Sequence, residues 1–405
     1  MTPSAKCAPL LLTRVCRTWR ACALMTSCLW TSFKLQSPMM ENKAAFESLT
    51  SFASAWLEHS GAHPLSLSLT IPTIENARPP LSLSTHIPRC KDLQLSSPTS
   101  LYDDVPKSPM PHLETLSITF PRQRDFPESN LTTFEHSPHL RSLTIEDLTG
   151  KGLPRLVLPW SQLTDLRVEG WEPTKHWLEV LRDCTSLKSC TLTPGGEVFL
   201  VGGAPVPVTF PHMETLRLHP RRVLGFIYAL DHFAAPALRH LEVSIPGHIV
   251  PLFRELAPLL KRSQCQLESL SVTGFRIDAF QDFITLCELM PSLKRLEIDG
   301  VGRFNFPSKQ IFEALTRRAD GHGCLLPRLE AFRLHLSVGP QDYPEDAVEE
   351  MLESRSSELR EADIHLQRRQ HDWVASLVNG GMRWYSEDFG GKVVKKDLDS
   401  DAMEY

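Results

Sequence analysis

The sequence lacks the clustered residues from which most catalytic and metal centres are built. Its ten cysteines include no C-x-x-C pair, and its histidines show no spacing typical of metal ligands. The glycine pair at Gly195 and Gly196 stands outside the G-x-x-x-x-G-K-[ST] and G-x-G-x-x-G frames and predicts only a loop hinge. His322 and Cys324 lie close together in the sequence, but nothing else completes a catalytic triad. We therefore expect a protein that is not an enzyme and has no cofactor or metal site.

The sequence also lacks a large net charge and long apolar runs. Lysine and arginine number 43 and aspartate and glutamate 48, a net charge of −5 with histidine neutral, which gives no reason to expect nucleic acid as a partner. The apolar run at Leu10 to Leu12 ends at Arg14, too soon for a signal peptide, and no stretch reaches the roughly eighteen apolar residues of a membrane span. Scattered cysteines then favour free buried thiols in a cytoplasmic or nuclear protein with no membrane partner.

What the sequence does contain is a short strand motif that recurs along most of its length. In the clearest copy, P-S-L-K-R-L-E-I, Leu293, Leu296 and Ile298 follow the spacing L-x-x-L-x-L, and the last two alternate with polar residues as in a half-buried strand. Further copies start 23 to 36 residues apart, at Leu113, Leu140, Leu163, Leu187, Met213, Leu238, Leu267, Leu329 and Leu359. Such a period with one strand per unit predicts a solenoid, whose units bury their apolar faces only by stacking.

The segments between these strands change character along the chain. Up to about residue 160 they are rich in proline, serine and threonine and predict loops. Later segments show helical spacing at 174–184, 223–233, 249–260, 278–289 and 308–318. Because a strand, a crossover helix and a parallel strand wind right-handed, we expect an α/β solenoid with a curved parallel sheet and helices on its outer face. The predicted boundaries are 62–365 for the solenoid, 366–394 for a C-terminal cap and 395–405 for a disordered tail.

This repeat resembles the leucine-rich-repeat family, and the resemblance covers about residues 60 to 365. The family's fuller consensus places Asn or Cys three residues after the third apolar position, where this chain has other residues, such as Pro121, Leu148 and Trp171. The departure predicts an irregular solenoid with variable coils.

Residues 8–35 predict a short helical unit that leads into a strand over 31–35. Leu12, Val15, Cys16, Trp19, Cys22 and Ala23 recur at three- and four-residue steps and form one apolar face of a helix. A linker helix with the same kind of spacing is predicted over 41–61 and ends at Gly61. One interpretation is that the first helix is an amphipathic cap that covers the first coil.

The same segment resembles the second half of an F-box, in which V-C-x-x-W is followed by L-W and a strand. The run W-L-E-H-S-G-A-H-P-L-S-L-S-L also resembles a junction found in F-box and repeat proteins of mushroom-forming fungi. In that family the box docks a SKP-type adaptor and so joins a cullin-based ubiquitin ligase. The family's opening L-P-x-E-[IL]-L helix has no counterpart in this sequence. The resemblance implies adaptor binding through Leu12, Val15, Cys16, Trp19, Leu29 and Trp30.

The variable positions of the repeats predict a second binding surface, on the face of the sheet opposite the helices. Residues on either side of the second apolar position point out of the sheet, and those of the later repeats, including Glu361 and Asp363, are charged with mixed sign. A nucleic-acid surface would carry a stripe of one sign, whereas mixed signs suit a protein target or a merely solvated face. The candidate target-binding residues are Asp165, Arg167, Arg217, His240, Glu242, Arg295, Glu297 and Arg333.

Together these observations predict a substrate-recognition subunit of a SKP-cullin-F-box-type ubiquitin ligase that binds an unknown protein target. The alternative is a leucine-rich-repeat binding scaffold with a degenerate F-box and no link to a ligase.

Overall fold

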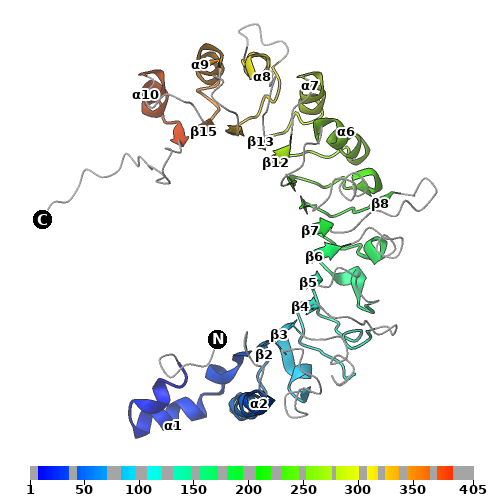
Figure 1. The fold of residues 1–405 in the computed structure, drawn as a ribbon, viewed down its shortest axis with the longest axis vertical. Coiled ribbons are helices and arrows are strands. Elements are labelled where there is room, and N and C mark those ends of the chain that lie inside the picture. Colours follow the sequence, from blue (N-terminus) through cyan, green and yellow to red (C-terminus); the bar gives the residue numbers. More distant parts are fainter. Residues whose placement is uncertain are drawn as a thin grey trace, which may run out of the picture. The chain divides into compact units, whose positions relative to one another are not determined.

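The computed structural model of the chain describes residues 8–35, 43–70, 84–96, 107–120, 131–147, 156–171, 180–194, 207–219, 230–245, 252–275, 280–300, 308–317, 324–336, 344–364 and 372–385. These residues belong to two compact units, Met1–Gly202 and Gly203–Tyr405. Parallel strands that follow one another along the chain dominate each unit (Figure 1).

In the first unit the strands pair in sequence order from β1 to β7, and every pairing is parallel. Their bounds are β1 (Ser32–Leu35), β2 (Leu65–Thr70), β3 (Cys90–Ser96), β4 (Thr115–Phe120), β5 (Ser142–Asp147), β6 (Asp165–Trp171) and β7 (Ser189–Pro194). The helical elements are the short 3-10 turns η1 (Leu12–Arg14), η2 (Ser27–Trp30), η3 (Ile87–Arg89) and η5 (Trp160–Gln162) and the helices α1 (Arg17–Met25) and α2 (Lys43–Glu58).

The second unit repeats this arrangement, with helices in several of its connections. Its main strands are β9 (Thr215–Leu218), β11 (His240–Ser244), β12 (Ser269–Phe275), β13 (Arg295–Gly300), β14 (Ala331–Leu336), β15 (Glu361–Ile364) and β16 (Arg383–Tyr385). A small parallel pair, β8 (Val208–Thr209) and β10 (Phe233–Ala234), stands apart from them. The helices α6 (Leu252–Ser263), α7 (Phe280–Glu288), α8 (Ser308–Leu315), α9 (Glu345–Ser354) and α10 (Asp372–Asn379) lie on one side of the strands (Figure 1).

The apolar positions of the repeat stack in register and form the core. Leu270, Leu296 and Phe332 are direct neighbours in the β12, β13 and β14 pairings, and all three are buried. Cys190 occupies the same kind of position in β7, and burial raises the pKa of its thiol, so it packs as a small apolar residue. The predicted α/β architecture with a long parallel sheet is therefore confirmed, and it is compatible with a solenoid-like repeat.

The structure adds elements that the sequence analysis did not predict. β3 is a full repeat strand with Cys90 in the first apolar position, where a search for leucine at that position does not find it. Helix α9 and the strand β16 were also missed, the latter because Trp384 is in register with the second apolar position of β15 and a glycine, Gly381, stands three residues before it. Helices α6, α7 and α8 match predicted segments, whereas parts of 174–184 and 223–233, and all of 395–405, lie outside the described residues.

One buried cation ties the coil of α9 to the coil before it. Arg355, directly after α9, has no exposed surface. Its Nε donates to the Leu315 carbonyl at 2.5 Å, and its Nη1 and Nη2 donate to the carbonyls of Leu326 at 3.0 Å and Leu325 at 2.5 Å. One guanidinium thus satisfies the carbonyl at the end of α8 and two carbonyls of the following loop.

We expect Arg355→Met to lower the free energy of unfolding of the second unit by about 3 kcal/mol, because the buried carbonyls lose their charged donor. Urea unfolding followed by circular dichroism measures the change. Arg328→Met, at an exposed arginine of the same loop, is the matched control. Equal unfolding midpoints for the two variants would contradict this role of Arg355.

Candidate functional sites

Helix α1 begins directly after Cys16, which is its N-cap, and it does not continue the helical turn before it. Cys16 has extended backbone angles, and its Sγ accepts a hydrogen bond from the Trp19 N–H at 3.5 Å. The predicted helix is therefore interrupted: Leu12 belongs to η1, Val15 and Cys16 lie between the two elements, and Trp19, Cys22 and Ala23 are in α1. Periodicity alone did not reveal this break, because a cysteine thiol is a weak hydrogen-bond acceptor that sequence patterns do not mark as a cap.

The six candidate residues of this segment divide between surface and core. Val15 is 57% exposed and Trp19 is 52% exposed, and Cys16 is exposed as well. Leu12 and Leu29 are partly exposed. Trp30 is 3% exposed and donates its indole N–H to the Ala23 carbonyl at 2.8 Å, so it anchors the segment from within.

We call the exposed large apolar residues of this segment, Leu11, Val15, Trp19 and Met25, the α1 apolar surface. The arginines Arg14, Arg17 and Arg20 alternate with them in the sequence and are exposed. The side chains that carry most of the predicted apolar helix face thus point to solvent.

Helix α2, and not α1, packs against the first strand of the sheet. Trp56 contacts Trp30 and Phe33 edge-on, with ring centroids 4.9 and 5.7 Å away. Gly61, at φ +58° just beyond α2, is in the left-handed region expected of a glycine after a helix. Helix α2 therefore covers the first strand, the role that the cap interpretation gives to the first helix. That interpretation leaves the exposure of Val15 and Trp19 unexplained.

The second candidate surface is the sheet face of the second unit, and strand register gathers its residues into rows. Arg217 is paired with Glu242, which is paired with Ser271, and the row continues through Glu297 and Arg333 to Asp363. A parallel row contains His240, Ser269, Arg295, Ala331, Glu361 and Arg383. The structure therefore brings six of the eight predicted target-binding residues together on one face.

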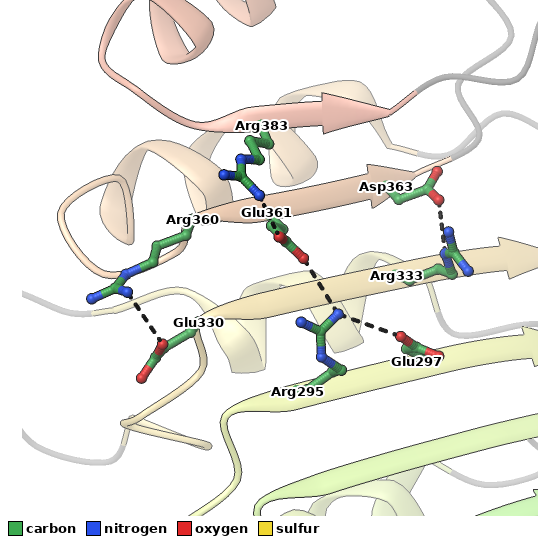
Figure 2. A network of polar contacts seen from close by, with 8 residues as sticks. All are labelled: Arg295, Glu297, Glu330, Arg333, Arg360, Glu361, Asp363 and Arg383. Atoms are coloured by element: carbon green, nitrogen blue, oxygen red, sulfur yellow. Dashed lines mark hydrogen bonds and ion pairs between the residues drawn. The ribbon is translucent and has the colours of Figure 1, made fainter. Parts of the chain in front are cut away.

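Most of these charges already have partners on the same face (Figure 2). Arg295 Nη1 lies 3.6 Å from Glu297 Oε1 on its own strand and 3.3 Å from Glu361 Oε2 two strands away. The intervening residue of that row is Ala331, whose small side chain leaves the space that the arginine crosses. Arg383 contacts the other oxygen of Glu361 at 3.3 Å.

A similar contact closes the other end of the row. Arg217 Nε lies 3.2 Å from Glu242 Oε2, and His219 Nε2 lies 3.7 Å from Glu242 Oε1. His240 is exposed next to them in the parallel row. The face therefore presents pre-arranged pairs of opposite charge.

Asp363 is the most deeply buried carboxylate of this network, with 9% of its side chain exposed. It accepts a hydrogen bond from Arg333 Nε at 2.8 Å, and its other oxygen lies 2.7 Å from His335 Nε2. Burial by itself would raise the pKa of the Asp363 carboxyl, but its contacts with His335 and Arg333 outweigh burial and lower that pKa below 3.8.

The remaining two candidates, Asp165 and Arg167, lie on β6 in the first unit. Arg167 donates to Glu169 on the same strand, with Nε 2.9 Å from Oε1, and Asp165 accepts from the Thr164 hydroxyl at 2.7 Å. Serine and threonine flank both residues on the paired strands, namely Ser142, Ser189, Thr144 and Thr191. This face is richer in hydroxyl groups than that of the second unit.

Sequence reasoning missed two members of the network in the second unit. His335 follows the third apolar position of its repeat, where no variable position was expected to matter. Arg383 belongs to β16, which lacks the leucine motif. The first could have been found by extending the alternation one step further along β14, whereas the second had no sequence signal.

The described part of the chain contains neither a cluster of metal-ligating residues nor a membrane-spanning helix. No group of three or more His, Cys, Asp or Glu residues there could hold a metal ion. No helix there is long and apolar enough to cross a membrane.

Two comparisons with known proteins found no counterpart for this chain. No model of a known protein family matches the sequence, and a search of curated proteins returned no match either.

We expect Asp363→Asn to lower the free energy of unfolding by about 2 kcal/mol at pH 7, since a charged acceptor of two hydrogen bonds is lost. Because the folded-state pKa is lowered, the carboxylate stabilises the fold fully above its ordinary value of 3.8, and this contribution is lost as pH falls through the folded value. The urea midpoints of wild type and Asp363→Asn, measured from pH 7 down to about pH 3, should therefore approach each other as the pH falls.

Glu350→Gln, at an exposed carboxylate of α9 on the helix side, is the control and should leave the midpoint within error at every pH. A constant difference between wild type and Asp363→Asn across the whole pH range would contradict the assignment.

Proposed function

We propose that this chain is a non-enzymatic substrate-recognition subunit of a SKP-cullin-F-box-type ubiquitin ligase. The α1 apolar surface docks the adaptor, and the sheet face of the repeats binds a protein target. The observation that carries the proposal is the exposure of Val15 and Trp19, the residues that match the F-box pattern V-C-x-x-W.

Exposed tryptophan is costly unless a partner covers it, and tryptophan and arginine are the residues most enriched among binding hot spots. Trp19 stands between Arg17 and Arg20, all three exposed, so an apolar anchor is surrounded by positive charge. This combination supports a protein partner with an apolar pocket and an acidic rim.

The sheet face supports the second half of the proposal. Its charged pairs are held by a rigid ladder of strands, so a target meets side chains whose positions are set before binding. Mixed charges of this kind select a partner by electrostatic complementarity and disfavour partners that place like charges opposite.

The mechanism is one of proximity. A chain that binds an adaptor at α1 and a target at the repeats raises the effective concentration of the target near the ligase. Transfer of ubiquitin then proceeds without any catalytic residue on this chain.

Trp19→Ala should weaken binding to a purified SKP-type adaptor at least about tenfold, as expected for truncation of a hot-spot tryptophan. Isothermal titration with the full chain measures the dissociation constant. Thr18→Ala, an exposed neighbour on the same helix, is the control and should bind as wild type does. If the wild-type chain binds no adaptor, the ligase link fails and a binding scaffold without that link is the function that remains.

The target surface is tested by removing the Arg295 and Glu297 pair. Arg295→Ala combined with Glu297→Ala leaves the net charge of the chain unchanged. The double variant should no longer co-purify with the proteins that bind the wild-type chain and accumulate when the proteasome is inhibited. Lys309→Ala combined with Glu313→Ala deletes a matched pair on α8, on the helix side, and should retain them. Quantitative mass spectrometry compares the two, and an identical set of partners would contradict the placement of the target site.

A further inference from the structure

A row of charges of alternating sign lies at the start of the strands, at the residue after the first apolar position of each repeat. We call this row the charged rung. From β3 to β15 its members are Lys91, Glu114, Arg141, Thr164, Lys188, Glu214, Arg239, Glu268, Lys294, Glu330 and Arg360. Positive and negative residues alternate without exception along the sequence, apart from the neutral Thr164.

Backbone hydrogen bonds hold successive rung residues side by side within each unit. The Arg141 N–H donates to the Glu114 carbonyl at 2.9 Å in the first unit. In the second unit the Lys294 N–H donates to the Glu268 carbonyl at 2.8 Å, and the Arg360 N–H donates to the Glu330 carbonyl at 2.7 Å. Each rung side chain therefore stands one strand spacing, about 4.8 Å, from the next.

The side chains use this proximity. Lys91 lies 3.2 Å from Glu114 in the first unit. In the second unit, Glu268 contacts Arg239 at 3.2 Å through one carboxylate oxygen and Lys294 at 2.9 Å through the other. The hydrogen bond from Lys294 lowers the pKa of the Glu268 carboxyl. Glu330 and Arg360 approach to 3.9 Å (Figure 2).

The buried residues by themselves do little to specify which strand pairs with which. Strands β4, β5, β11, β12 and β13 all present leucine and then valine or isoleucine to the core at the same two positions. A strand that skipped its neighbour and paired with the next strand along would bury nearly the same apolar groups. The charged rung distinguishes the two arrangements, because skipping one coil places a cation beside a cation or a carboxylate beside a carboxylate.

We propose that the alternating charges of the rung select the order in which the strands pair during folding. Correct neighbours attract. Apart from pairings that involve β6 and its neutral Thr164, a pairing that skips one coil brings together like charges, which destabilise a cross-strand pair. Each exposed ion pair contributes little stability on its own. The preference for the correct neighbour is repeated, however, at each coil whose rung residue is charged. This inference does not depend on the proposed function.

The experiment compares two variants of the full chain that differ in whether the rung charges still alternate. The exchange variant, Glu268→Lys with Lys294→Glu, creates two contacts between like charges, with Arg239 and with Glu330. The inversion variant reverses the seven rung charges that follow the neutral Thr164 along the sequence: Lys188→Glu, Glu214→Lys, Arg239→Glu, Glu268→Lys, Lys294→Glu, Glu330→Lys and Arg360→Glu. It keeps the alternation, and because four cations and three carboxylates are reversed, it makes the net charge more negative by two.

The chains are unfolded in urea and diluted, and the soluble fraction with native circular dichroism is measured at low salt and at about 1 M salt, where the Debye length is only about 3 Å. We expect the exchange variant to recover less than about half of the wild-type fraction at low salt and to approach wild type at high salt. The inversion variant should refold as wild type does in both buffers.

Three results would overturn the proposal. The first is refolding of the exchange variant that equals wild type at low salt. The second is an equal defect in the inversion variant, which would show that particular residues matter and their alternation does not. The third is an exchange variant that refolds normally but has a lower equilibrium urea midpoint. The rung would then stabilise the folded state without selecting the order of the strands.

Discussion

The pairing of each repeat strand with the next repeat strand along the chain, in parallel and in register, is the constraint on which the rest of the structure depends. Side chains of a strand alternate between its two faces, so an in-register stack places every L-x-L pair in the core and every variable residue on the open face. Leu216, Leu241 and Leu270 show the result: they are register neighbours from three different repeats, and all are buried.

The stacking of the strands also sets the positions of the charged side chains on the open face of the sheet. Arg295 and Glu361 are 66 residues apart in the chain, yet they meet because two strand spacings and the small Ala331 separate them. Most of the pairs on this face are half-exposed, and such pairs add little to stability. Their order matters more, because charges set at fixed intervals present a defined pattern to a partner and to neighbouring coils.

The N-terminal segment follows a different rule. Trp30 and α2 attach it to the first strand through buried aromatic contacts. Val15 and Trp19, by contrast, remain more than half exposed. A segment anchored by one tryptophan and presenting another is suited to binding, which is why this surface, and not the sheet alone, carries the proposed link to an adaptor.

The sequence by itself determined where most of the repeat strands lie and which residues they bury, because the spacing L-x-x-L-x-L is a local pattern that one repeat displays in full. It also assigned Arg295, Glu297 and Arg333 to the open face, since alternation along a strand is local too. Only the tertiary structure decided that Cys16 caps α1, that Cys90 begins a repeat strand, and that Arg295 reaches Glu361 while Asp363 joins Arg333 and His335. Those contacts depend on partners from other coils or on weak caps, and a linear pattern does not encode the space that a small neighbour such as Ala331 leaves open.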